Sequence, residues 1–481
     1  MPFYGTFDGQ GYTISNLKVN TSSQYVGIFG YSKGFATIRN VVVDSSCSFT
    51  STDKLMVYIG GIIGDHYESG GPFLAENCVN MGSLFFDRNV SSRLYIGGIA
   101  GEIKSTDFES NIVNCANYGP ITFSGSVRNK YAYIGGIVGG TKGLKEVWPI
   151  VYNCVNYGSI AMEGTVASPY VGGIVGESRK SEFKNCLSAG KISTITEIKL
   201  IGTISGNAST VTNITNCYWT SDAGSYESCG YDGLGTGLST VTDSSSIEPN
   251  EEGLNKLNTN AEANSWSKWL LATNDATVSF KANSNGKAFE LSSGFVLIPE
   301  FESPWRDFEG WFDGENAFVA TSISESKTLT GKFTNKDFTL IFDLGNGTVL
   351  NEMHAFDEPI TYPYTVDLPN KYFGGWDTTF DKMLGEDTIV RGTWFNCSDT
   401  VDVTFGTIKL IERDIKKISR ELSNDESGKS FDVEQYVIDG VNEVITATIK
   451  FDTSANAIKF LRACVDKKKE NNILSAEFLY K

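Results

Sequence analysis

Short apolar runs separated by glycine dominate the first 220 residues of the chain. A first box, Tyr-(Val/Ile)-Gly-Gly-Ile-x-Gly in its regular copies, recurs at spacings of 34, 37, 38, 37 and 30 residues, counted between Gly27, Gly61, Gly98, Gly136, Gly173 and Thr203. A second box, an apolar residue followed by x-Asn-Cys or x-Asn-Val, follows each copy of the first. The runs are β-branched and aromatic and lack a 3.6-residue period, which predicts strands rather than helices.

Each repeat offers two or three strands, and one such unit cannot bury its apolar face alone. Stacking the units in register buries a continuous core, with strands ~4.8 Å apart between coils. We therefore expect a parallel right-handed β-solenoid over residues 1–220. Identical residues then stack on one another, so each Cys sits on a Cys and each Asn bonds to the next coil. These structural columns are Asn77, Cys78, Asn114, Cys115, Asn153, Cys154, Asn185, Cys186, Asn216 and Cys217.

The number of residues between the first and second box varies from 12 to 17. The extra residues fall in the segments 65–75, 102–112 and 140–151, which we expect to loop out on one side of the solenoid. Loops on a rigid scaffold are a common place for recognition, so this side is the predicted interaction face. The glycine pairs recur in every regular copy, which favours a structural bend over a ligand groove.

The Gly-Gly-Ile-Val-Gly box together with Asn-Cys-x-Asn-x-Gly-x-Ile resembles the GLUG-motif repeats of bacterial and protist surface proteins. The opening segment Phe7–Leu17 is similar to the first coil of such arrays. The resemblance implies an extracellular, often adhesive β-solenoid. It brings no agreed catalytic residues.

Residues 221–276 depart from the repeat, and we expect them to cap the solenoid end with a short helix within 251–271, anchored in the core by Trp266 and Trp269. Two modules of strands follow, at 277–335 and 336–397. They share the motif Phe-x-Gly-Trp, which ends at Trp311 and at Trp376. This pattern resembles the Listeria–Bacteroides repeat of internalin B type, which implies small β-grasp-like modules.

Residues 398–481 show a different pattern. Apolar residues at spacings of 3, 4, 3 and 4, from Ile408 and Ile411 through Leu422, predict one helix, and Ile458, Leu461 and Val465 predict a second. With strands before, between and after them, the order is βαββαβ, the arrangement of ferredoxin-like folds. The chain is therefore expected to be mainly β and to end in an α+β domain.

Charge and chain ends narrow the functional classes. The chain has 40 Lys+Arg against 57 Asp+Glu, a net charge of −17, which argues against a nucleic-acid partner. No run approaches the ~20 apolar residues of a membrane-spanning helix. The first residues carry no signal peptide, yet the repeat is already running at Tyr12, so we expect a fragment of a longer chain or assembly.

The nine cysteines form no CxxC pair and the chain has two histidines, so we predict no metal site and no cofactor. Cys217 and Cys229, 12 residues apart, are the candidate disulfide of a secreted protein. Six sequons are candidate glycosylation sites: Asn20, Asn89, Asn207, Asn213, Asn346 and Asn396.

Three functional hypotheses remain. The first is a non-enzymatic extracellular or cell-surface protein for adhesion or structural presentation, whose partner is a protein or a glycan. The second is a polysaccharide-acting β-helix enzyme, which requires paired carboxylates. Here the acidic residues are interpreted as scattered, with no acidic position repeated between coils: Asp44, Asp65, Glu102, Asp107, Glu146 and Glu177. The third is a structural subunit of an intracellular assembly.

Overall fold

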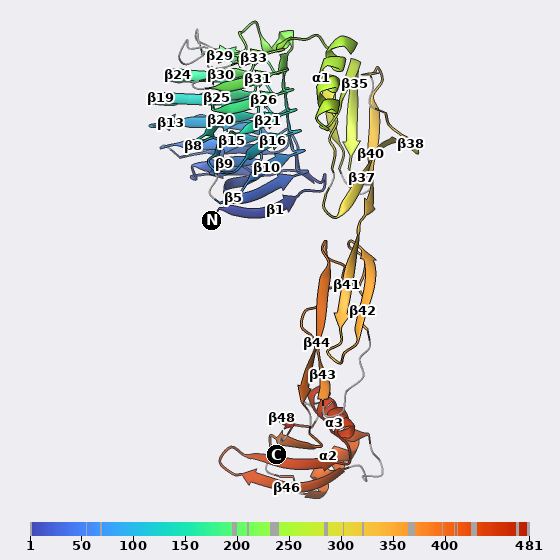
Figure 1. Ribbon diagram of the computed structural model, residues 1–481. Coiled ribbons are helices and arrows are strands. Elements are labelled where there is room, and N and C mark those ends of the chain that lie inside the picture. The colour runs from blue at the N-terminus through green and yellow to red at the C-terminus, as the bar shows by residue number, and fades with distance from the viewer. Residues whose placement is uncertain are drawn as a thin grey trace. The chain divides into compact units, whose positions relative to one another are not determined.

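The computed structural model describes the chain except residues 1, 54, 68–69, 195–199, 209–210, 231–239, 283–286, 302, 320–321, 364–370, 397, 408, 411, 425–430, 468–470 and 479–481. The described residues are mainly strands (Figure 1). They form two compact units, residues 1–334 and residues 335–481, which are described separately.

The repeat region of the first unit is a solenoid-like stack of parallel strands, as the sequence predicts. Each coil contributes one strand to each sheet, and this strand pairs with the equivalent strand of the next coil. Two of these sheets follow the second box. One contains β2 (Thr13–Ile14), β6 (Val42–Val43), β11 (Val79–Asn80), β17 (Ala116–Asn117), β22 (Val155–Asn156), β27 (Leu187–Ser188), β32 (Tyr218–Trp219) and β34 (Ser245–Ser246), and we name it the flank sheet. The other contains β3 (Lys18–Thr21), β7 (Ser48–Ser51), β12 (Ser83–Phe86), β18 (Ile121–Phe123), β23 (Ile160–Met162) and β28 (Ile192–Thr194).

The first box builds a third sheet and one half of a fourth. The third contains β4 (Tyr25–Val26), β8 (Val57–Gly60), β14 (Leu94–Gly97), β19 (Ser126–Gly135), β24 (Thr165–Gly172) and β29 (Ile201–Gly202), with β13 (Asn89–Val90) beside β19. The fourth sheet joins two stacks through the long strand β5 (Phe29–Arg39), on which β1 (Phe3–Asp8) also pairs. Its stacks are β9 (Ile63–Tyr67), β15 (Ala100–Ser105), β20 (Val138–Gly143), β25 (Val175–Arg179) and β30 (Ser205–Ala208), and β10 (Phe73–Glu76), β16 (Ser110–Val113), β21 (Ile150–Tyr152), β26 (Ser181–Lys184), β31 (Thr212–Thr215) and β33 (Thr240–Thr242).

The register between coils brings equivalent positions of the repeat together. Asn80 pairs with Asn117, and Asn117 with Asn156. The glycines of the first box lie where two strands of one coil nearly touch. A Cβ at Gly97 would overlap the carbonyl oxygen of Ala100 and the backbone of the next coil. Glycine is thus required by close approach at this bend.

The predicted outward loops are shorter than expected. The first residues of the segments 65–75, 102–112 and 140–151 belong to β9, β15 and β20, and several of their side chains are buried. Only the connections after these strands, such as 106–109 and 144–149, lie outside the sheet. The prediction took all of the extra residues between the two boxes as loop. Part of them instead extends the strands β9, β15 and β20.

The segment expected to cap the solenoid has two parts: its first strands pair with the last repeat, and its helix packs along the side of the stack. Helix α1 spans Glu251–Ala263, within the predicted range, and Asn250 caps it by accepting a hydrogen bond from the Gly253 N–H. Trp269 lies in a strand, not in the helix. Leu254, Leu257 and Ala261 bury the helix in a core shared with the flank sheet. Figure 1 shows α1 alongside the stack of coils. Strands β33 and β34, with the 3-10 turn Ser221–Ala223, continue the stack beyond the last repeat.

The next strands belong to the same compact unit and the same core. The sheet has the order β36-β35-β40-β37-β38, with β39 beside β35. Its bounds are β35 (Trp269–Lys281), β36 (Phe289–Leu297), β37 (Arg306–Asp313), β38 (Asn316–Ala317), β39 (Ser322–Ile323) and β40 (Lys327–Asn335). We name α1 and this sheet together the flank module. The residues on both sides of the expected boundaries at 220/221 and 276/277 lie in the first compact unit.

The second unit holds two four-stranded sheets. The first has the order β42-β41-β44-β43, with β41 (Asp337–Asp343), β42 (Val349–Ala355), β43 (Lys371–Trp376) and β44 (Thr388–Asn396). The second is antiparallel, with the order β46-β47-β45-β48, and its strands are β45 (Thr400–Phe405), β46 (Phe431–Asp439), β47 (Val444–Phe451) and β48 (Ile473–Phe478). Helix α2 (Glu412–Ser423) follows β45 in the chain, and helix α3 (Ser454–Asp466) follows β47. Ile408 and Ile411 of the predicted helical face lie outside the described residues.

Candidate functional site

The second box forms the corner between two sheets of the solenoid. Its asparagines adopt left-handed backbone conformations, with φ from 51° to 60° at Asn16, Asn40, Asn77, Asn114, Asn153, Asn185 and Asn216. Asparagine tolerates this conformation better than most residues, which explains its recurrence at the turn. The following cysteines Cys78, Cys115, Cys154, Cys186 and Cys217 are fully buried in the solenoid core.

The corner asparagines bind both to one another and to the flank module. Asn153 donates to Asn114 Oδ1 and Asn185 donates to Asn153 Oδ1, each at 2.8 Å. Asn153 also accepts from the Trp269 indole N–H at 2.8 Å and donates to the Ser267 carbonyl. Thus the column predicted to hold coils together is also the edge on which the flank module docks.

The same docking edge continues to the last repeat. Asn185 donates to the Leu257 carbonyl of α1 at 3.1 Å, and Asn216 donates to Asn260 Oδ1 at 2.7 Å. Among the described residues, the Oδ1 of Asn77 has no hydrogen-bond partner. The amide contacts with the flank module run from Asn114, which accepts from the Ser267 N–H, to Asn216.

Sequence reasoning missed a second asparagine ladder, three residues after the first. Asn80 Nδ2 donates to Asn117 Oδ1 at 2.8 Å, and Asn117 Nδ2 donates to Asn156 Oδ1 at 2.9 Å. Each amide also donates to the carbonyl of the glycine two residues on. All three side chains are fully buried. The signal was present, because the box reads Asn-Cys-x-Asn in three coils.

No disulfide links the cysteines of the described chain. Burial raises the pKa of Cys78 and of Cys115 well above that of an exposed thiol. The structure records no disulfide between the candidate pair Cys217 and Cys229. Cys217 is buried in the solenoid core next to Cys186, whereas the backbone of Cys229 forms an isolated parallel β-bridge with Ser205.

The candidate glycosylation sites differ in accessibility. Asn20, Asn89, Asn346 and Asn396 are exposed, and Asn213 is partly buried and accepts a hydrogen bond from Thr240. Asn207 is 5% exposed and pairs within the sheet with Glu177, which leaves no room for a glycan there. The burial of Asn207 therefore disfavours it among the six candidate sites.

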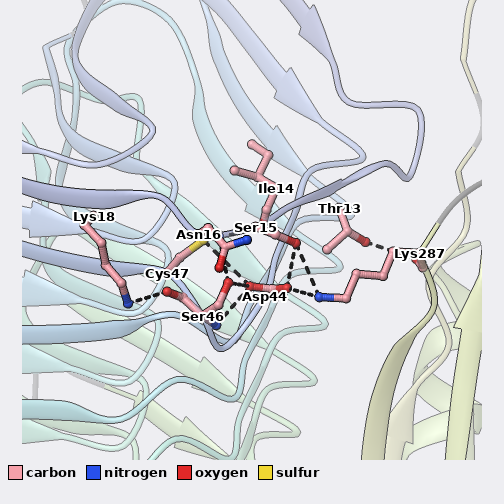
Figure 2. A network of polar contacts seen from close by, with 9 residues as sticks. All are labelled: Thr13, Ile14, Ser15, Asn16, Lys18, Asp44, Ser46, Cys47 and Lys287. Carbon is pink, nitrogen blue, oxygen red and sulfur yellow. Dashed lines mark hydrogen bonds and ion pairs between the residues drawn. The ribbon is translucent and has the colours of Figure 1, made fainter.

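A polar network ties the flank module to the second coil of the solenoid (Figure 2). The Lys287 ammonium contacts Asp44 Oδ2 at 2.5 Å, and the Thr13 hydroxyl donates to the Lys287 carbonyl at 3.3 Å. Ser15 and Ser46 also donate to the Asp44 carboxylate. Burial opposes ionisation of Asp44, but Lys287 and the serine hydroxyls outweigh it and hold its pKa well below the usual value.

Carboxylates do repeat between coils, contrary to the interpretation of scattered acids. Asp65 pairs in register with Glu102, and two coils further on Glu177 occupies the same position, with Gly140 between them. Lys104 binds both Asp65, at 2.9 Å, and Glu102. Arg179 binds Glu177 at 2.6 Å. The three carboxylates are only 3% to 4% exposed, so each is a buried, cation-paired group.

The buried carboxylates pack beside a ladder of stacked tyrosines. Neighbouring rings lie 5.4, 5.0, 4.8 and 5.5 Å apart along Tyr25, Tyr58, Tyr95, Tyr133 and Tyr170. Burial, opposed by the Lys104 charge, raises the pKa of Asp65 to about 6. A catalytic carboxylate must be accessible to its substrate, whereas the carboxylates of Asp65 and Glu102 are buried.

A groove of about 680 Å³ lies between the flank sheet and the flank module. Its floor is formed by consecutive residues of one solenoid column, and its rim carries carboxylates from both sides. The lining residues include Met81, Tyr118, Tyr157, Ala189, Thr220, Asp222, Glu248, Glu290 and Gly294. Tyr118 and Tyr157 stack with ring centroids 5.5 Å apart. This groove was not predicted, because the flank module was expected elsewhere.

Two further observations concern metals and membranes. Within the described part of the chain, no three His, Cys, Asp or Glu side chains gather as ligands for a metal ion. The helices described here are too short or too polar to cross a bilayer.

Comparison with known proteins gives limited information. No family model matches the chain, and no solved structure matches it. A segment of 131 residues is 28% identical to a protein named "Putative membrane protein" from Evansella cellulosilytica. The match covers 25% of this chain and 19% of that protein, so the chain spans a small part of this relative.

Proposed function

We propose that the chain is a non-enzymatic, extracellular or cell-surface protein for adhesion or structural presentation. The observation that carries the proposal is the in-register solenoid with the flank module docked along its side. Its asparagines, thiols and carboxylates are used within the scaffold, in ladders, in the core and in ion pairs. Such a scaffold holds recognition surfaces rigidly, as surface repeat proteins do.

Finer features of the fold belong to the same proposal. The solenoid is right-handed and of GLUG type, the two sheets centred on Trp311 and Trp376 are β-grasp-like B-repeat modules, and the last domain is ferredoxin-like. Its strand order β46-β47-β45-β48 supports the last assignment. The similarity to a protein named as a membrane protein supports a place at the cell surface.

The test is surface labelling of cells of the native source with a membrane-impermeant biotin reagent and an antibody to the chain, followed by attachment of chain-coated beads to those cells. We expect labelling of intact cells and bead attachment above that of albumin-coated beads. Labelling only after lysis, or beads that attach no better than the albumin control, would contradict the proposal.

One observation favours a second candidate, a structural subunit of an intracellular assembly. No disulfide joins any of the eight cysteines of the described chain, as expected in a reducing compartment. Labelling only after lysis, together with sedimentation of the chain in large particles, would support it. The intact mass of the native protein with and without reductant adds an independent measure of glycans and disulfides.

A further inference from the structure

One lysine of the solenoid lies between two buried carboxylates of neighbouring coils. The Lys104 ammonium contacts Asp65 Oδ1 at 2.9 Å and also contacts a carboxylate oxygen of Glu102. Asp65 lies on β9, whereas Lys104 and Glu102 lie on β15, the paired strand of the next coil. Asp65 is in register with Glu102, so the lysine reaches diagonally across the strand pair. The amine of one coil is thus held within hydrogen-bond distance of a carboxyl group of the previous coil.

Tyrosine rings cover this cluster. Lys104 Nζ lies 5.3 Å from the centroid of the Tyr58 ring, and its side chain is only 14% exposed. Gly140, in register with Glu102 on the following coil, has no side chain. A Cβ at Gly140 would lie 2.8 Å from a carbon of the Tyr95 ring and 3.5 Å from Glu102 Cγ. Glycine therefore leaves room for the Tyr95 ring beside Glu102, and the rings keep water away from the cluster.

Burial changes the protonation of the three groups. It raises the pKa of Asp65 to about 6, although the Lys104 charge opposes this change. Asp65 therefore binds a proton more readily than an exposed aspartate, and a neutral carboxylic acid, unlike a carboxylate, is open to attack by an amine. Burial alone would lower the pKa of Lys104, but Glu102 and Asp65 outweigh it and raise that pKa. The ammonium thus needs the adjoining Glu102 carboxylate to take its proton.

We propose that Lys104 and Asp65 condense to an amide bond that joins the two coils covalently. With Asp65 protonated, the Lys104 ammonium passes a proton to Glu102, and Nζ attacks Asp65 Cγ. Glu102 then gives its proton to the departing Asp65 hydroxyl and takes one from Nζ. The Nζ–Cγ bond forms, one Cγ–Oδ bond breaks, and one water molecule leaves. Nothing is oxidised or reduced, and no co-reactant is consumed.

Three physical effects favour this condensation. The fold holds the amine and the carboxyl group together, which replaces an encounter in solution by an intramolecular step. Glu102 acts as general base and then as general acid on the reacting atoms. The product replaces the buried ion pair of Lys104 and Glu102 by an amide and a neutral carboxylic acid, which removes the cost of two buried charges. Exclusion of water then protects the amide from hydrolysis. Both reacting groups belong to the chain, so burial does not separate them, and the link is independent of what the solenoid binds.

The equivalent position two coils further on is a natural control. Glu177 there is bound by Arg179, whose guanidinium stays charged and is not a nucleophile. The residues in register with Glu177 are Gly140 and Asn207, so no second carboxylate lies beside it in the ladder. Arg179→Lys would therefore place a lysine next to one carboxylate without the second group that moves the proton.

The test is the intact mass of the full chain, measured in urea with reductant, for the wild type and for Lys104→Arg. Both chains have the same ends, so processing of the ends cancels. We expect the wild type to be lighter than its sequence by one water molecule and Lys104→Arg to have the mass of its sequence. Trypsin does not cleave after an acylated lysine, so residues 55–88 should remain joined to residues 94–128. This peptide also distinguishes the link from loss of water elsewhere.

Two variants test the proposed chemistry. Glu102→Gln keeps both reacting groups but cannot carry the proton, so we expect the link to form at least about a hundredfold more slowly and the purified variant to be mainly unlinked. We expect Arg179→Lys to lose one water molecule, as the wild type does, and not two.

A wild-type chain with the full mass of its sequence overturns the proposal, and this measurement does not depend on whether any variant folds. A joined peptide in which Lys104 is bound to Glu102 instead of Asp65 also overturns it. Complete linkage in Glu102→Gln, or a second lost water in Arg179→Lys, refutes the role of the second carboxylate. Absence of the chain from the cell surface would contradict the proposed function and leave the mass unchanged.

Discussion

Removing Asn117 from the buried asparagine ladder tests how the coils are held together. The side chain is fully buried and makes three hydrogen bonds: to the Gly119 carbonyl at 3.0 Å, to Asn156 Oδ1 at 2.9 Å, and from Asn80 Nδ2 at 2.8 Å. Each bond contributes about 0.5–1.5 kcal/mol, and each buried partner left unpaired costs about 1–3 kcal/mol. We expect Asn117→Ala to lower the free energy of unfolding of the first unit by about 3–5 kcal/mol.

Asn117→Asp separates hydrogen bonding from shape, because the two side chains have nearly the same size. An ionised Asp has no proton to donate to Gly119 or Asn156, whereas a protonated one has one. Burial among acceptors raises its folded-state pKa above the unfolded value of about 3.9. Stability of this variant is therefore greatest below about pH 4 and is lost as the pH rises through the folded-state pKa.

The assay is urea unfolding followed by far-UV circular dichroism, with native-state hydrogen exchange to read the coil around residue 117. The exposed Asn316, changed to Ala, is the control, and we expect it to alter stability by less than about 0.5 kcal/mol. A loss below about 1 kcal/mol for Asn117→Ala, or a pH-independent Asn117→Asp variant, would refute the role of the ladder.

Three further expectations follow from the first unit and its neighbours. Gly97→Ala forces a Cβ into the backbone of the next coil and should destabilise the protein by several kcal/mol, whereas Gly440→Ala meets nothing within 4 Å and should be neutral in the same thermal melts. Lys104→Met leaves two buried carboxylates without a cation and should cost about 3–5 kcal/mol near neutral pH. Because Asp65 then binds its proton more tightly when folded, that variant should lose stability as the pH rises above about 4, and a loss that shrinks with rising pH would count against this assignment. Cys78 and the thiols stacked with it should resist iodoacetamide in the native protein and react only in urea, as measured by intact mass; rapid native labelling would contradict their burial.

The solenoid could be predicted because its signal is local and repeated. Tyr, Gly-Gly, Ile and Asn-Cys recur in order, and stacking is the way for such short strands to bury their apolar sides. The acidic position was also visible in principle. Asp65, Glu102 and Glu177 each lie four residues after the central glycine of the first box, but Gly140 interrupts the series. The variable connections that follow concealed this regularity.

The docking of the flank module could not be predicted from the sequence. The bond from Trp269 to Asn153 joins residues 116 positions apart, and the bond from Lys287 to Asp44 joins residues 243 apart. An asparagine at a solenoid corner has the same local pattern whether its amide faces water or a partner. The groove was missed for the same reason, since one of its walls comes from the docked module.

The flank module also sets the length of the solenoid. Lys287 forms an ion pair with Asp44 on the second coil, while Asn260 of α1 binds Asn216 on the last repeat. Duplicating one repeat between these two contacts would move them apart by ~4.8 Å, and either the ion pair or the hydrogen bond would have to break. A repeat array without such a docked module can gain or lose whole repeats with little loss of stability. Here the flank module, which lies outside the array, fits only one number of coils.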